Sequence, residues 1–118
     1  INVKNAEYQK AELNLKKSKL LGRDYETKLQ SELEKFLLKS NELDRKEKLY
    51  ISRIIPLAEQ IFDLNSTEYS TNKSSFENVV KSLNEVINRK IELLNIKQAQ
   101  AKNINNIEKS LSLYSYDR

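Results

Sequence analysis

Several residue types on which catalysis and metal binding depend are missing from this sequence. It contains no cysteine and no histidine, and only one glycine. Without cysteine there is no disulfide framework and no thiolate metal site, and without histidine the commonest general acid or base is absent. No glycine-rich phosphate loop is present, and the Asp and Glu residues are spaced as on a solvated helix face. We therefore expect a protein that is not an enzyme and that binds no cofactor or metal ion.

Long hydrophobic runs are also absent. No run of apolar residues approaches the roughly 20 that a membrane-spanning helix needs. The chain has no recognisable signal peptide and opens with Ile1 rather than methionine. We therefore expect residues 1–118 to form one domain that is a segment of a larger protein, or a mature chain with its ends removed.

The charged residues make up 32% of the chain, and the 21 basic side chains are interleaved with 17 acidic ones. A surface that binds nucleic acid has its Lys and Arg residues clustered. Interleaved charges are instead typical of a solvated helix surface, so we expect no nucleic-acid partner.

Apolar residues recur with heptad spacing over residues 29–64, which predicts a coiled-coil seam. The two alternating seam positions are occupied by Leu29, Leu33, Phe36, Ser40, Leu43, Glu47, Tyr50, Ile54, Leu57, Ile61 and Leu64. The heptad phase continues past Pro56, so the sequence predicts one kinked but continuous helix from about residue 2 to about residue 68. At Gly22 we expect a bend or a close contact with another helix.

A second heptad pattern follows and predicts a helix from about residue 75 to about residue 112. Its seam positions hold Phe76, Val80, Leu83, Ile87, Leu94, Ala101, Ile104 and Leu111, interrupted by Lys90 and Lys97. We expect the Ser- and Tyr-rich end of the chain to leave the helix. Other apolar residues fall outside both seams: Leu37, Leu38, Ile51, Ile55, Phe62, Val79, Val86, Leu93, Ile96 and Ile107. They indicate either further partner helices or loose packing within the pair.

The segment between the two patterns is polar and predicts a turn at about residues 70–74. Asn72 is the residue here best able to adopt the left-handed conformation that ends a helix when glycine is absent. Ser74 and Glu77 have the spacing of a capping box that starts the next helix. A connection this short makes the helices antiparallel. The predicted fold is therefore all-α, a long antiparallel coiled-coil hairpin with unequal arms.

Around this turn, Tyr69, Asn72, Phe76, Val79 and Val80 have a spacing that resembles the helix-turn-helix tip of the TolC-type outer membrane efflux factors. That family has a Tyr, a Gly three residues on, an apolar residue four beyond, and then a Val-Leu pair. Asn72 replaces the usual Gly. The stretches IIPLAEQIFDL and NVKNAEYQKAELNLKKSK are similar to the family's Pro-containing segment and to the opening of its long periplasmic helix.

The resemblance implies the periplasmic α-helical barrel of a homotrimeric efflux channel in the outer membrane of a Gram-negative bacterium. The tip would form the aperture and bind a periplasmic adaptor (membrane fusion) protein, which connects the channel to an inner-membrane pump. The transported cargo would be small molecules or metals. The implied tip residues are Tyr69, Asn72, Ser74, Ser75, Phe76, Asn78 and Lys81.

Some matched positions depart from the family pattern. Tyr69 and Ser74 match positions that lock the closed aperture by hydrogen bonds in some members. The family often has Arg at the position of Ser74. Asn78 and Lys81 match positions where acidic residues ring the pore in some members, and neither is acidic here. Two other functions are compatible with the sequence. One is a structural coiled-coil scaffold or spacer, and the other is a periplasmic adaptor, whose hairpin arms would be of roughly equal length.

Overall fold

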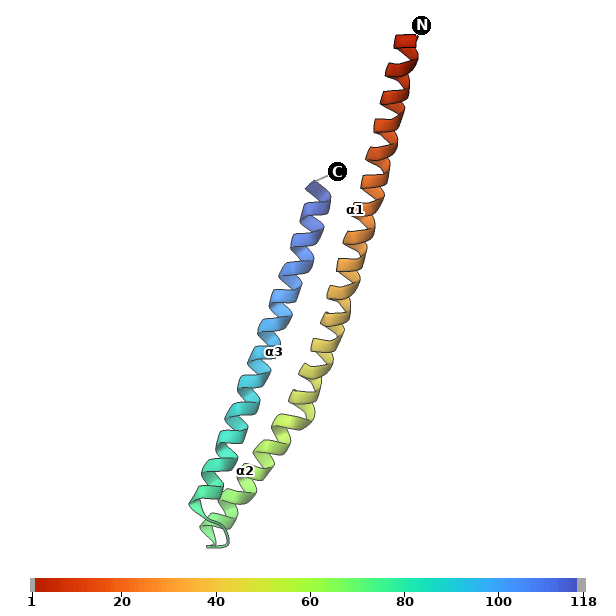
Figure 1. Cartoon of the computed structure of the whole chain (residues 1–118). Helices are drawn as coiled ribbons and strands as arrows, with labels where there is room; N and C mark the ends of the chain where they lie inside the picture. The colour runs from red at the N-terminus through yellow and green to blue at the C-terminus, as the bar shows by residue number, and fades with distance from the viewer. Residues whose placement is uncertain (1, 117–118) are drawn as a thin grey trace.

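The computed structural model describes residues 2–116, without the side chains of residues 2–5, 18, 20 and 114–116. This part of the chain is all helical apart from one turn. Its elements are α1 (Asn2–Leu49), a π-helix η1 (Tyr50–Ile54), α2 (Ile55–Ser70) and α3 (Phe76–Tyr116). The molecule is a rod of 103 × 18 × 16 Å (Figure 1). The predicted all-α hairpin with unequal arms is confirmed.

The two arms meet at the turn and run antiparallel from there. Towards its C-terminal end α3 lies beside residues 26–33 of α1, where Leu111 shares a groove with Leu29 and Leu33. Beyond the end of α3, α1 continues alone (Figure 1). Among the described residues, no atom outside the neighbouring backbone of α1 lies within 4 Å of where the Gly22 Cβ would be. The expected close contact at Gly22 is therefore not found, and α1 passes through Gly22 as a continuous helix.

The helix ends agree with the predicted ones except at the end of α3. The turn occupies residues 71–75, close to the predicted 70–74, but α3 continues to Tyr116 rather than ending near 112. The expectation that the Ser- and Tyr-rich end leaves the helix is wrong as far as Tyr116, and residues 117–118 lie outside the described residues. Ser and Tyr cost a helix only a fraction of a kcal/mol, about 0.5 each, and no Gly or Pro follows Pro56 to end it.

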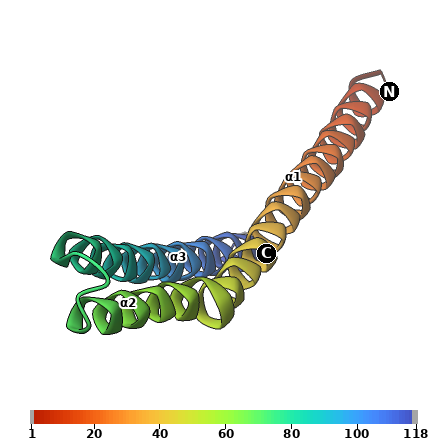
Figure 2. The same cartoon turned by 90° about the horizontal axis from the view of Figure 1, so that it is seen from below.

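The irregularity around Pro56 is a π-helix rather than a simple kink. The Ile55 N–H donates to the Tyr50 carbonyl oxygen, five residues earlier. Proline has no N–H to donate, and in a regular α-helix its ring clashes with the carbonyl group four residues before it, here that of Ser52. The wider π turn lies directly ahead of Pro56, and the first arm bends there. Seen along the rod, α2 and α3 lie side by side while α1 turns away from them (Figure 2).

The π-helix shifts the seam of the first arm by one residue, because a π turn holds one residue more than an α turn. Before it, Leu43 is buried at a predicted seam position. After it, Ile55 is buried and Ala58 and Phe62 are half-buried against α3. The predicted continuation is wrong: Leu57, Ile61 and Leu64 are 57%, 49% and 58% exposed.

The inward face of α3 also differs from the predicted one. The buried and half-buried residues with heptad spacing are Val79, Ser82, Val86, Arg89, Leu93, Ile96, Gln100, Asn103, Ile107 and Ser110. Most apolar residues at the predicted seam positions are exposed, from Phe76 to Leu111. Seven of the ten residues expected outside the seams face inward instead: Ile55, Phe62, Val79, Val86, Leu93, Ile96 and Ile107. The two arms therefore meet across a seam that mixes apolar and polar side chains.

Two exposed apolar stripes remain, one on each helix near the turn. The α2 stripe consists of Leu57, Ile61 and Leu64, and the α3 stripe consists of Phe76, Val80, Leu83, Ile87 and Leu94. They are displaced in opposite directions from the seam between the helices, as the contacts on either side of that seam show.

Contacts across the seam place the stripes on opposite faces of the hairpin. Leu57 and Ile61 share a groove with Glu85 and Arg89. On the other side, Lys90 Nζ lies 3.7 Å from Glu59 Oε1. Glu85 and Lys90 flank the inward Val86–Arg89 pair as the g and e positions of a heptad flank a and d. Leu83, seven residues before Lys90, therefore lies on the face opposite to the α2 stripe.

Candidate functional site at the hairpin tip

The turn that joins the arms is built on a left-handed Asn72, which has a φ of 59°. The Asn72 N–H donates to the Tyr69 carbonyl (3.1 Å), and the Lys73 N–H donates to the Glu68 carbonyl (2.7 Å). These two bonds form a Schellman motif, which satisfies carbonyl groups that the end of a helix leaves without partners. Asn takes the position where Gly is commonest, so the predicted role of Asn72 in ending the helix is confirmed.

The next helix is capped by Ser75 rather than by Ser74. The Asn78 N–H donates to Ser75 Oγ at 3.2 Å, which is the N-cap bond to the third residue of a helix. Asn78 Nδ2 donates to Ser74 Oγ at 3.2 Å. The predicted Ser74–Glu77 capping box is therefore wrong by one residue, because the turn ends one residue later than expected. Glu77 instead lies 3.4 Å from Lys81 Nζ in an exposed ion pair.

An aromatic pair closes the turn. The rings of Tyr69 and Phe76 have centroids 5.6 Å apart and are tilted by 55°. Such a tilted pair contributes about 0.5–1.5 kcal/mol beyond the area that it buries. Both rings remain largely exposed, at 47% and 61%. The structure thus brings the sequence-predicted tip residues together within two turns of helix on either side of residues 71–75, with an apolar aromatic surface at their centre.

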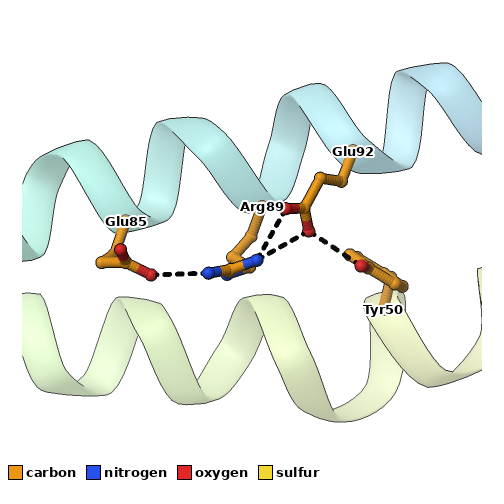
Figure 3. A network of polar contacts seen from close by, with 4 residues as sticks. All are labelled: Tyr50, Glu85, Arg89 and Glu92. Atoms are coloured by element: carbon orange, nitrogen blue, oxygen red, sulfur yellow. Dashed lines mark hydrogen bonds and ion pairs between the residues drawn. The ribbon is translucent and has the colours of Figure 1, made fainter.

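Away from the tip, a polar cluster joins the arms at the π-helix (Figure 3). Arg89 Nη1 donates to both Glu92 carboxylate oxygens, at 2.6 and 2.8 Å, and Arg89 Nη2 donates to Glu85 Oε2 at 2.8 Å. From the opposite arm, Tyr50 Oη donates to Glu92 Oε2 at 2.8 Å. Tyr50 is the first residue of the π-helix, so this bond fixes α3 beside the point where the first arm bends.

The cluster shifts the protonation equilibria of its members. The Tyr50 hydroxyl, and next the Arg89 guanidinium, stabilise the Glu92 carboxylate and lower the pKa of Glu92. The same hydrogen bond to Glu92 raises the pKa of Tyr50, since the hydroxyl must keep its proton to donate. Hydrogen bonds to Glu85 and then Glu92 raise the pKa of Arg89.

The heptad pattern does not predict this cluster, because it places Tyr50 in an apolar seam and the three charged residues on a solvated face. The available signal was the spacing of Arg89, four residues after Glu85 and three before Glu92, which is the spacing of helix ion pairs. A tyrosine at a seam position was a second signal, because a buried phenol usually needs a partner for its hydroxyl.

Further polar contacts fix α3 along α1. Gln100 Nε2 donates to Asp44 Oδ1 at 2.9 Å and to Glu47 Oε2 at 2.7 Å. Asn103 Nδ2 donates to the Phe36 carbonyl at 2.8 Å. Asn103 is 2% exposed, and its Oδ1 has no hydrogen-bond partner among the described residues. Polar side chains at seam positions specify the register of two helices at some cost in stability.

The described part of the chain contains no group of three or more metal-ligating side chains that could hold an ion. None of the described helices is long and apolar enough to cross a membrane. Comparisons with family models, curated proteins and solved structures give no significant match to this chain.

Proposed function

We propose that this chain is a periplasmic helical-barrel segment of a trimeric outer membrane efflux channel, with the hairpin tip at the aperture. The observation that carries the proposal is the conformation of Asn72. Its φ of 59° is the left-handed conformation that glycine adopts most easily, and Asn72 stands where the TolC-type pattern has Gly. The Tyr69–Phe76 ring contact joins two other positions of the same pattern.

The two apolar stripes support the proposal independently of the tip. A helix in a barrel wall needs a neighbour on each side, whereas a lone hairpin covers only one side of each arm. Here each arm near the turn has a second apolar surface, and the two surfaces lie on opposite faces. Apolar surface of this extent is typical of protein–protein contacts.

In this proposal the exposed tip aromatics bind a periplasmic adaptor protein, which connects the channel to an inner-membrane pump for export of small molecules or metals. Tyr69 and Phe76 present apolar rings at the end of the rod, and aromatic residues are common in the energetic centres of interfaces. Asn78 and Lys81 bring no negative charge to the tip, so a cation-selective acidic ring is not part of the proposal.

Site-specific photocrosslinking in the source cell tests this function. A photoreactive residue at Phe76 should capture a periplasmic adaptor with a helical hairpin of its own. The matched control is a photoreactive residue at the exposed Glu108 on α3, far from the tip, which should not capture it. Capture of the adaptor at both positions, or of no adaptor at Phe76, would contradict the proposed role of the tip.

The rod shape favours a second candidate, a structural coiled-coil scaffold or spacer. The rod is 103 Å long, and polar contacts fix the register of its helices. Such a rod can hold two other proteins at a fixed separation without forming a channel. Such a scaffold needs no adaptor at its tip, so the crosslinking experiment separates the two functions.

A further inference from the structure

The second half of the first arm carries two alternative seams, one residue apart. The π-helix directs Ile55, Ala58 and Phe62 toward α3 and leaves the α2 stripe exposed. Without the π-helix, the heptads that precede it would continue directly into Leu57, Ile61 and Leu64. Both seams are largely apolar, and only the extra residue held in the π turn decides between them.

We propose that α2 has a second register, in which η1 closes into a regular α-helix and the α2 stripe replaces Ile55, Ala58 and Phe62 against α3. If the five residues of η1 change from π-helical to α-helical winding, α2 rotates about its axis by about 100°, the angle between successive residues of an α-helix. On the surface of α2, the α2 stripe is centred about this angle away from the residues that now face α3, and the rotation turns the stripe toward α3. The occupant that covers the α2 stripe is therefore α3 of the same chain.

The contacts between the arms divide at the π-helix into a fixed part and a movable part. On the α1 side, Gln100 and Asn103 hold α3 through bonds of 2.7–2.9 Å, and Tyr50 holds Glu92 at 2.8 Å. All of these bonds lie at or before Tyr50 on the first arm. A turn of α2 about its axis leaves each of them intact.

On the α2 side, the polar contacts described between the arms are longer and exposed. Asn65 Nδ2 donates to the Asn78 carbonyl at 3.5 Å, and Glu59 pairs with Lys90 at 3.7 Å with both side chains more than half exposed. Exposed ion pairs contribute little to stability. The part of the hairpin nearest the tip is thus held by apolar packing that the second register can replace.

Pro56 biases the equilibrium toward the observed register. In a straight α-helix its ring would clash with the Ser52 carbonyl, and the π turn avoids this clash. A neighbouring helix bound to the α2 stripe would bias it the same way, because that stripe is exposed only while the π-helix is present. The inference concerns this chain alone and does not depend on the efflux function.

Disulfide trapping tests the two registers, since the chain has no cysteine of its own. Val79 is half-buried in the α3 seam, next to the Asn78 carbonyl that Asn65 contacts at 3.5 Å, and serves as the common partner. Asn65→Cys with Val79→Cys reports the observed register, because Asn65 is half-buried against α3 at this level. Leu64→Cys with Val79→Cys reports the second register, because Leu64 now points away from α3. A minor state populated at roughly 1–10% still accumulates as disulfide, because oxidation traps it.

Two further changes should move the Leu64–Val79 disulfide in opposite directions. Pro56→Ala removes the clash with the Ser52 carbonyl and should speed it. Deletion of Ser52 in the Pro56→Ala chain removes the extra residue, so that the Ile55 N–H meets the Tyr50 carbonyl as an ordinary α-helical bond, with no proline ring against the carbonyl four residues before it, and the observed register is locked. We expect this deletion to slow Leu64–Val79 crosslinking about tenfold or more relative to Pro56→Ala.

The Asn65–Val79 disulfide is the control for folding, and it should form in the parent chain and in the deletion variant. A Leu64→Cys, Asn84→Cys pair, with Asn84 on the outward face of α3, measures crosslinking by unfolded chains. The proposal is overturned if Leu64–Val79 crosslinks no faster than this outward pair. It is also overturned if deletion of Ser52 leaves the Leu64–Val79 rate unchanged while Asn65–Val79 still forms.

Discussion

Asn103 is the most completely buried polar residue described in the seam, and replacing it with leucine should stabilise the hairpin while loosening its register. Asn103 is 2% exposed, donates one hydrogen bond to the Phe36 carbonyl at 2.8 Å, and leaves its Oδ1 without a partner. The Phe36 carbonyl lies inside α1 and keeps its helical partner when the Asn side chain is removed. The substitution therefore leaves no polar group newly unpaired.

The magnitude follows from four effects, two favourable and two unfavourable. Loss of the Asn103–Phe36 bond costs about 0.5–1.5 kcal/mol, and removal of the unpaired Oδ1 returns about 1–3 kcal/mol. A buried leucine contributes a further ~1.5–3 kcal/mol, of which overpacking takes back about 1–3 kcal/mol. At the middle of these ranges, Asn103→Leu should raise the free energy of unfolding by about 1 kcal/mol.

Urea unfolding followed by far-ultraviolet circular dichroism measures this change. Asn103→Ala is the control, because it removes the same polar atoms without adding buried apolar surface, and its stability should lie below that of Asn103→Leu. Sedimentation of Asn103→Leu should show a broader distribution of oligomers, because a polar residue at a seam position specifies pairing. A loss of more than about 1 kcal/mol in Asn103→Leu would refute the argument, because it would mean that the buried amide contributes more than one ordinary hydrogen bond.

Three other changes test separate parts of the structure. Asn72→Gly should raise the free energy of unfolding by up to about 1 kcal/mol, because glycine adopts the left-handed conformation without strain at Cβ. Asn72→Pro should lower it, because proline cannot reach a φ of 59°; equal melting temperatures of the two variants would contradict the turn. Tyr50→Phe should lower stability at pH 7 by up to about 1 kcal/mol. The pKa of Glu92 is lowered in the folded chain, so the stability that the Glu92 carboxylate contributes is present above its ordinary pKa of 4.5 and is lost as the pH falls through the folded-state pKa. The difference in unfolding free energy between the parent chain and Tyr50→Phe should therefore shrink in urea titrations at acid pH. Gly22→Ala should stabilise the α1 helix by roughly 0.5–1 kcal/mol and so increase its helical circular dichroism signal. No increase in the signal would indicate a contact at Gly22.

Much of the fold follows from sequence pattern and turn chemistry. Heptads on either side of a polar segment predict two antiparallel helices, and the left-handed conformation of Asn72 follows from the absence of glycine in the turn. The sequence also places Tyr69 and Phe76 on either side of that turn. The capping residue is predicted one position too early, because Ser74 and Ser75 are both good N-cap residues and only the length of the turn selects between them.

The predicted seam of α1 and η1, from Leu29 to Ile54, faces inward, but the inward faces of α2 and α3 could not be predicted because each of these helices carries two interleaved heptads. On α3 the more apolar heptad, through Leu83 and Ile87, is exposed, while the heptad through Ser82 and Val86 faces the partner arm. Pattern alone favours the more apolar choice. The observed choice depends on hydrogen bonds between residues far apart in the chain, such as that between Asn103 and Phe36.

The shift of seam at Pro56 has a similar origin. A proline in a helix predicts a kink, but the sequence does not say whether the chain bends within an α-helix or inserts a π turn. The π turn moves every later side chain by one residue, which is why the α2 stripe is exposed rather than buried.

Fractionation of the source cell with an antibody to residues 1–118 tests the efflux-channel proposal most directly. The proposal predicts that the antibody detects, in the outer membrane fraction, a polypeptide several times longer than this chain. Detection only in the soluble or cytoskeletal fraction would contradict it and favour the coiled-coil scaffold.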